Sequence, residues 1–246
     1  MDSQDLVTIA EVTSKLAKTT AIYLARLGVD GTSGNHVFRG TQLELDLANA
    51  ALDALKQKYG FEGFHFAGQS GGSKLAAALA VVRRDVGCAV LGSGRFDAPE
   101  VPKSKEPSHN YFDTTEHVAQ LAQNHALRLY LVTDKADKRV PSAHQSGFAD
   151  KLRRAGRAVP QYFVETTDEL HHGTFQFTEL VAAGCVLDRP EDEIAAALAT
   201  QNKRNAEYNE RRRKEADAKT AILAAARQSA PSPSVPSPSA AASGKK

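Results

Sequence analysis

The chain has 246 residues, of which 41% are hydrophobic, and carries 31 basic against 29 acidic residues. This length and composition suffice for a real hydrophobic core, as one large domain or two small ones. A formal net charge of +2 is too small to make nucleic acid or an acidic membrane the main partner. No apolar run reaches membrane-spanning length and the amino terminus is polar and acidic, so we expect a soluble, cytoplasmic protein.

The hydrophobic pattern alternates between helix-like and strand-like segments along most of the chain. A helix is expected over residues 5–19, and apolar strand-like runs cover residues 21–27, 64–67, 88–91, 127–133 and 161–165. Helical stretches cover residues 43–58, 74–84, 115–124 and 142–155. The first of these four places Leu43, Leu47, Ala51 and Leu55 on one face. Regular alternation with fully apolar strands predicts an α/β fold, a mostly parallel sheet with helices on both faces.

Composition divides the chain into three regions. Residues 1–189 are expected to form the α/β domain, and residues 190–228, rich in Ala, Glu, Lys and Arg, a long charged helix. The basic cluster at 211–214 in that helix is interpreted as a solvated face rather than a nucleic-acid patch. Residues 229–246 are almost entirely Pro, Ser, Ala and Gly, with two terminal lysines, a composition that predicts disorder.

Residues 94–110 lack periodicity and contain three prolines, which predicts a long loop. Two interpretations stay open for it: a cover over the functional site, or a solvated connector.

The two cysteines, Cys88 and Cys185, lie in apolar segments. We expect two buried thiols rather than a disulfide, in keeping with a cytoplasmic location. No cysteine spacing of zinc-site type is present, and the adjacent His171 and His172 point in different directions, so no metal site is expected.

The most informative motif is Gly68-Gln69-Ser70-Gly71-Gly72, between an apolar strand and an Ala/Leu-rich helix. A serine hydroxyl is a poor nucleophile, so an enzyme that uses one holds it on a sharp turn beside a base and backbone N–H donors. We expect Gly68 and Gly72 to be required because side chains there would collide with the strand and helix. The pattern favours a nucleophile elbow over a plain turn serine.

A serine nucleophile needs a base, and the base needs a carboxylate that orients it. Asp134 and Asp137 follow the strand-like run 127–133, and His171 and His172 follow the run 161–165. Because the carboxyl ends of parallel strands meet at one edge of a sheet, these candidates should gather there. From the residues alone, either aspartate and either histidine fits.

The elbow, the Asp-x-x-Val-Pro at 137–141 and the His-Gly at 172–173 resemble the α/β-hydrolase superfamily, nearest its dienelactone hydrolase and prolyl-oligopeptidase-like branches. The likeness covers roughly residues 5–185. It implies Ser70 as nucleophile, Asp137 as acid and His172 as base, with Gly71 N–H in the oxyanion hole. It implies hydrolysis of a small-molecule carboxylic ester, or in second place a peptide, through an acyl-enzyme and without a cofactor.

The second oxyanion donor of that family comes from a loop upstream of the first helix. Here residues 5–19 and 21–27 correspond to the first helix and the strand after it, so the earlier strands have no counterpart. We interpret the chain as an N-terminally incomplete α/β-hydrolase fold; the alternative is a shortened homologue whose sheet closes differently. The rival function is a catalytically weak or inactive scaffold, whose charged helix engages a protein partner or a second copy of the chain.

Overall fold

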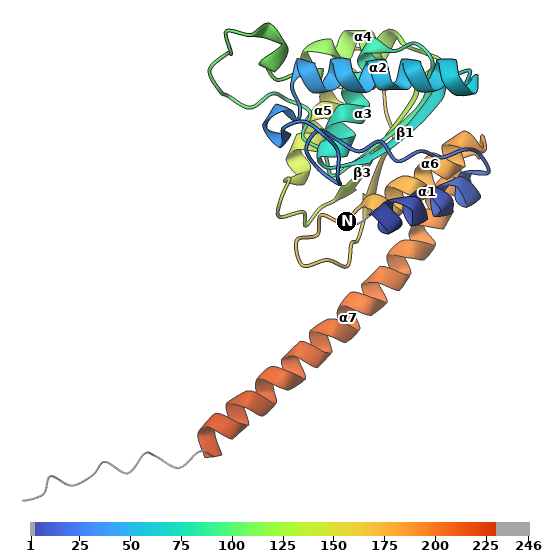
Figure 1. The fold of residues 1–246 in the computed structure, drawn as a ribbon. Helices are drawn as coiled ribbons and strands as arrows, with labels where there is room; N and C mark the ends of the chain where they lie inside the picture. Colours follow the sequence, from blue (N-terminus) through green and yellow to red (C-terminus); the bar gives the residue numbers. More distant parts are fainter. Residues whose placement is uncertain (1–2, 230–246) are drawn as a thin grey trace, which may run out of the picture. The chain divides into compact units, whose positions relative to one another are not determined.

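The computed structural model describes residues 3–229 (Figure 1). Their sheet has four strands, all parallel, in the spatial order in which they follow along the chain. The strands are β1 (Phe64–Gln69), β2 (Val86–Gly92), β3 (Arg128–Asp134) and β4 (Gln161–Val164). A parallel connection needs a crossover, and a helix supplies each one. The predicted α/β class with a parallel sheet is confirmed.

Six of the seven α-helices within residues 3–229 lie at expected stretches, and α6 was not predicted. They are α1 (Ser3–Ala17), α2 (Gln42–Tyr59), α3 (Gly71–Val82), α4 (Val118–Gln123), α5 (Ser142–Arg154), α6 (Phe175–Val186) and α7 (Glu191–Ser229). Three 3₁₀ turns, η1 (His36–Phe38), η2 (Pro107–His109) and η3 (Thr114–His117), lie in the connections. The predicted helix at 115–124 is therefore divided between η3 and α4.

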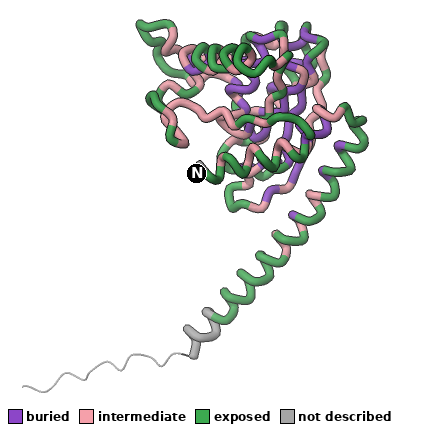
Figure 2. The backbone as a smooth tube through the Cα atoms, turned by 45° about the vertical axis from the view of Figure 1, so that its right-hand side comes forward, coloured by how far each residue is buried: buried purple, intermediate pink, exposed green. Residues whose placement is uncertain are grey.

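Helices cover both faces of the sheet, as expected, and the buried residues gather in the strands and the helices against them (Figure 2). On one face Ala89, Leu91 and Leu131 pack with side chains of α3, α4 and α5. On the other face Val90 and Val132 pack with α6 and with the first turns of α7. Because strand side chains alternate between faces, strands buried on both sides need the continuous apolar runs found in the sequence.

The apolar face predicted for α2 is only partly right: Leu55 packs against the apolar cluster between α2 and α3, but Ala51 is exposed. Leu47 is 48% exposed, whereas Leu45 and Leu52 are buried against α3. The cause is that α2 packs mainly on α3, and that Glu44 also faces inward, where its carboxylate pairs with Arg26. A helix with scattered leucines has more than one apolar stripe, and the partner selects which one is buried.

The predicted strand at 21–27 is wrong. This segment is an irregular connection between α1 and η1, and Leu24 packs against the apolar cluster between α2 and α3. Within the described residues β1 pairs only with β2, so the segment has no strand beside it. Strand backbone needs a neighbour to bond its N–H and C=O groups, and an apolar run without one does not become a strand.

The two cysteines form a disulfide, which corrects the expectation of free thiols. Cys88 lies on β2 and Cys185 on α6, with their Cα atoms 6.3 Å apart. Both are fully buried, as expected. The two cysteines are 97 positions apart in the sequence, and they meet only because α6 covers that face of the sheet, so the sequence alone did not reveal the pairing.

The chain divides into two compact units, one to Ala206 and one from Glu207. In the second unit, Glu210 pairs with Arg213 at 2.7 Å and with Lys214 at 3.4 Å on the surface of α7. Among residues 3–229 we find no helix with both the length and the apolar character needed to traverse a bilayer. Apart from Ser229, the last residue of α7, the predicted disordered tail lies outside the described residues.

Candidate active site

Ser70 occupies the turn between β1 and α3 with backbone angles φ 55° and ψ −120°. Few residues other than glycine adopt a positive φ with such a ψ, and the cost is about 1–3 kcal/mol. The turn is held by the Ser70 N–H, which donates to the carbonyl of Gly92 at 2.8 Å, and by the helix that begins at Gly71. Strain at a serine that begins a helix is the backbone geometry expected of a nucleophile elbow.

The glycines flanking Ser70 differ in importance. A Cβ at Gly68 would lie 2.6 Å from the carbonyl carbon of Gly72, so a side chain at 68 collides with the first turn of α3. A Cβ at Gly72 would meet nothing within 4 Å. The expected collision is therefore confirmed at Gly68 and wrong at Gly72, because the first turn of α3 faces open space there.

Asp137 lies in the turn after β3 and its carboxylate is fully buried. One oxygen, Oδ1, accepts the N–H groups of Arg139 at 2.9 Å and Val140 at 2.8 Å. The other, Oδ2, lies 2.8 Å from Nδ1 of His172. With Oδ1 occupied by two backbone donors, Oδ2 is the oxygen left to hold the imidazole.

His172 lies in the loop between β4 and α6 and is buried. Its N–H donates to the carboxylate of Asp168 at 3.0 Å, and the N–H of Gly173 donates to the same carboxylate at 2.8 Å. Burial alone would raise the pKa of Asp168, but these backbone donors outweigh it and lower that pKa. The carbonyl of His172 accepts the side-chain amide of Gln69 at 2.8 Å, which ties the loop to the residue before Ser70.

The two alternatives from the sequence pair with each other instead. His171 Nδ1 lies 3.3 Å from Oδ2 of Asp134, longer than the 2.8 Å of the His172 pair. That same oxygen of Asp134 accepts the N–H and the hydroxyl of Thr166, each at 2.8 Å. The His171 side chain is 29% exposed and that of His172 is 9% exposed. The geometry therefore favours Asp137 and His172 as the orienting pair.

Nε2 of His172 is buried and has no hydrogen-bond partner among the described residues. A buried, unsatisfied ring nitrogen is costly, and such atoms concentrate at functional sites. If Nδ1 donates to Asp137, then Nε2 carries the lone pair that a general base needs. The structure contains no bond between Ser70 Oγ and this nitrogen, a contact that in many enzymes tightens only when substrate binds.

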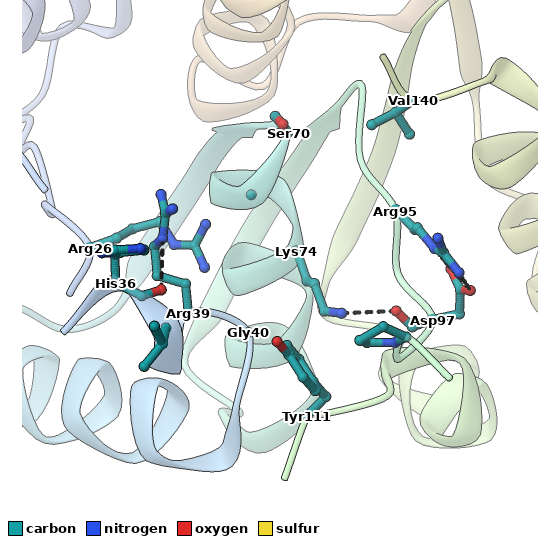
Figure 3. Close-up of a pocket in the computed structure, with 13 residues that line it drawn as sticks. Arg26, His36, Arg39, Gly40, Ser70, Lys74, Arg95, Asp97, Tyr111 and Val140 are labelled. Carbon is teal, nitrogen blue, oxygen red and sulfur yellow. Dashed lines mark hydrogen bonds and ion pairs between the residues drawn. The ribbon is translucent and has the colours of Figure 1, made fainter. Parts of the chain in front are cut away.

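A cavity of about 420 Å³ adjoins Ser70 and Gly71 (Figure 3). Four cationic side chains line it, namely Arg26, Arg39, Lys74 and Arg95. Sequence reasoning missed all four as site residues. One signal was available: Lys74 follows Ser70 by four residues at the start of a helix, so the two lie on the same side of that helix.

Residues 94–110 follow β2 as a loop, as expected, with η2 its only regular turn within the described residues. Arg95, Asp97 and Pro99 of this loop line the cavity. At its end the N–H of Gln42 donates to the carbonyl of Asn110 at 2.8 Å, which joins the loop to the start of α2. The start of the loop therefore borders the site, whereas residues 100–107 are exposed, so each of the two interpretations fits a part of it.

Arg26 comes from the irregular segment after α1 and reaches Gly71. Its Nε and Nη2 donate to the two oxygens of the buried Glu44 carboxylate, at 2.8 and 2.5 Å. The remaining nitrogen, Nη1, lies against the Cα of Gly71, so that a side chain at position 71 would collide with it. Glycine at 71 therefore leaves room for a guanidinium beside the residue that follows Ser70.

No protein-family model and no curated protein matches the sequence. Among solved structures, a Paleococcus ferrophilus monoacylglycerol lipase is similar at 12% identity and TM-score 0.47, covering 76% of this chain and 90% of that one. A Pyrococcus horikoshii acylaminoacyl peptidase is similar at 13% identity and TM-score 0.43, covering 61% of this chain. The chain spans only 28% of that peptidase. Likeness at this level carries no information on substrate or mechanism.

Proposed function

We propose that this protein is a serine hydrolase that cleaves carboxylic esters through an acyl-enzyme, with Ser70, Asp137 and His172 as its triad. The observation that carries the proposal is the pairing of His172 with the buried Asp137 in a loop bonded to Gln69, the residue before a strained Ser70. Three residues of complementary chemistry, each after a different strand, are brought to one edge of the sheet.

The chemistry follows from the roles of the three side chains. Ser70 Oγ attacks the ester carbonyl carbon while Nε2 of His172 takes its proton. Asp137 fixes the imidazole tautomer and stabilises the imidazolium that forms. The proton then passes from Nε2 to the departing alkoxide, and the acyl group stays on Ser70 until water, activated by the same nitrogen, releases the acid.

Negative charge on the carbonyl oxygen needs donors aimed at it. The N–H of Gly71, the residue after the nucleophile and the first residue of α3, is one such donor, aided by the positive end of the helix dipole. We assign Nη1 of Arg26 as the second. Nε and Nη2 of Arg26 donate to the carboxylate of Glu44. Nη1, which lies beside Gly71, is then the nitrogen available to donate to an oxyanion.

The test is hydrolysis of p-nitrophenyl butyrate by the purified full chain, with Ser70→Ala as the loss-of-function variant. Ser108→Ala is the matched control, because Ser108 is a serine of η2 whose hydroxyl bonds the exposed side chain of Glu106. We expect turnover in the parent and the control, and a loss of about a thousandfold or more in Ser70→Ala. Equal turnover in Ser70→Ala and the parent would overturn the nucleophile assignment.

Peptide hydrolysis is the second reaction that this triad would support. We prefer an ester because an alkoxide leaves more readily than an amine, which must first be protonated. Ester cleavage therefore depends less on proton transfer by His172. Comparing p-nitrophenyl butyrate with the p-nitroanilide of the same acyl group tests this preference. We expect the ester to be turned over faster.

A further inference from the structure

The cavity beside Ser70 is lined by more positive than negative side chains (Figure 3). Four cationic residues line it, whereas Asp97 supplies the one carboxylate among its lining residues. Arg95 pairs with Asp97 at 2.7 Å, and Arg26 pairs with Glu44 behind the cavity wall. Two cations, Lys74 and Arg39, are left over.

Neither of these two has an acidic partner within the described residues. Lys74 Nζ donates to the backbone carbonyl of Asp97 at 2.8 Å and lies 5.7 Å from the centre of the Tyr111 ring. Arg39 Nε donates to the backbone carbonyl of His36 at 3.2 Å. Both cations thus donate to neutral groups and line the cavity, Lys74 as a partly buried side chain and Arg39 as an exposed one.

This arrangement is costly without a ligand. Burial lowers the pKa of the Lys74 ammonium, and the carboxylates of Asp97 and Asp113 offset this only in part. A partly buried cation without a counter-ion is destabilised, and an anion in the cavity would restore a charge-assisted hydrogen bond. The cavity is therefore better suited to a negative ligand than to a neutral one.

The size of the cavity, about 420 Å³, limits the length of that ligand. Lys74 follows Ser70 by one helical turn, a rise of about 5.4 Å, and its N–H donates to the Ser70 carbonyl at 3.2 Å. Because Ser70 and Lys74 line the same cavity, a ligand that reaches both has a short chain of a few carbon atoms between its anionic group and the reacting carbonyl. Arg39 enters the same cavity from the connection before α2 and offers a planar donor fork that fits a carboxylate.

We propose that the substrate carries a carboxylate on its acyl part, bound by Lys74 and Arg39, so that the ester is a half-ester of a short dicarboxylic acid. This inference rests on the proposed function, because it places the carboxylate relative to a carbonyl attacked by Ser70. The two cations hold the carboxylate while the carbonyl lies between Ser70 Oγ and the Gly71 N–H.

The experiment compares two esters that differ only in charge: mono-p-nitrophenyl glutarate and its neutral methyl ester. We expect the parent protein to prefer the anionic ester in kcat/KM by about tenfold or more, the value of one charge-assisted hydrogen bond. In Lys74→Met the ratio of the two kcat/KM values should fall toward one. Lys103→Met is the matched control: the exposed Lys103 lies in the same loop as Asp97 but does not line the cavity.

Arg39→Gln is the second variant, because the exposed Arg39 can be replaced without disturbing the core. In this variant, too, the ratio of kcat/KM for the anionic ester to kcat/KM for the neutral ester should fall. Equal kcat/KM of the parent for the two esters, or an unchanged ratio in both variants, would overturn the carboxylate assignment even though esters are hydrolysed.

A binding measurement separates failure of this inference from failure of the proposed function. Calorimetry on Ser70→Ala should detect monomethyl glutarate and not dimethyl glutarate, with affinity that falls as salt is added. Charge-dependent binding that Lys74→Met weakens supports the carboxylate site even if no ester is turned over. Equal binding of the two compounds, or no binding of either, contradicts it.

Discussion

Two groups of side chains surround Ser70 and are held in different ways. The acid–base cluster, Asp137, His172 and Asp168, lies on turns that follow β3 and β4, and backbone N–H groups bind both carboxylates. The cation cluster, Arg26, Arg39 and Lys74, draws two members from the irregular connection between α1 and α2. That connection is held by the ion pair between Arg26 and the buried Glu44 of α2, together with local hydrogen bonds such as that from the Thr32 hydroxyl to the carbonyl of Arg26.

The two clusters differ in how precisely the backbone positions their side chains. Strand ends are positioned by the sheet's hydrogen bonds, so a turn that follows a strand inherits a fixed location. A connection with several positive-φ residues, such as Asp30 and Gly34, has only its own contacts to hold it. We expect changes in the acid–base cluster to remove chemistry outright, and changes in the cation cluster to weaken it by degrees.

The largest effect is expected for Asp137→Asn. An asparagine preserves shape but favours the wrong imidazole tautomer, so kcat on p-nitrophenyl butyrate should fall by about 10⁴-fold. Asp134→Asn makes the same change in the pair with His171 and is the matched control: it should lose stability and far less activity. Equal losses of activity in the two variants would show that the two pairs have been assigned the wrong way round.

The disulfide helps to anchor the acid–base cluster, because it joins β2 to α6, the helix after the His172 loop. It closes a loop with a sequence separation of 97 residues. Loop entropy then gives a stabilisation of about 4.7 kcal/mol. Urea unfolding of the parent with and without reductant, and of the double variant Cys88→Ala, Cys185→Ala, measures it. Two titratable thiols in the unreduced, unfolded protein would contradict the bridge.

On the cation side, Arg26→Met should lower kcat on a neutral ester by about a hundred- to a thousandfold, the usual cost of one oxyanion donor. KM should change little, because the donor acts on charge that appears in the transition state. Glu44→Gln keeps the guanidinium but loosens its anchor, and should lower kcat less. A loss confined to KM would make Arg26 a substrate-binding residue instead.

The smallest effect concerns an ion pair away from the cavity, between the buried Arg83 and the partly exposed Asp85. Hydrogen bonds from Arg83, and then from Lys56, lower the pKa of Asp85 from 3.8 to about 2. A lowered carboxylate pKa stabilises the fold above pH 3.8 and loses that contribution as the pH falls toward about 2. The stability difference between the parent and Asp85→Asn should therefore be present at neutral pH and shrink in acid. A difference that is constant across this range would contradict the shift.

Sequence reasoning succeeded where local pattern and fold geometry agree. Four of the five expected strands are present, and residues placed after them meet at one edge, because parallel strands leave no other arrangement. It failed where the structure of a segment depends on the segment packed against it. The buried face of α2 depends on α3, and residues 21–27 have no strand beside them. The pairing of Cys88 with Cys185 and the reach of Arg26 to Gly71 depend on contacts between distant segments, which periodicity does not encode.

The central claim is that Ser70 is an activated nucleophile. The most direct measurement is the intact mass of the full chain after incubation with a fluorophosphonate, followed by peptide mapping of the adduct. We predict one adduct per chain, located on Ser70, lost in Ser70→Ala and slowed in Asp137→Asn. A folded protein that stays unlabelled, or an adduct that persists in Ser70→Ala, would contradict the account.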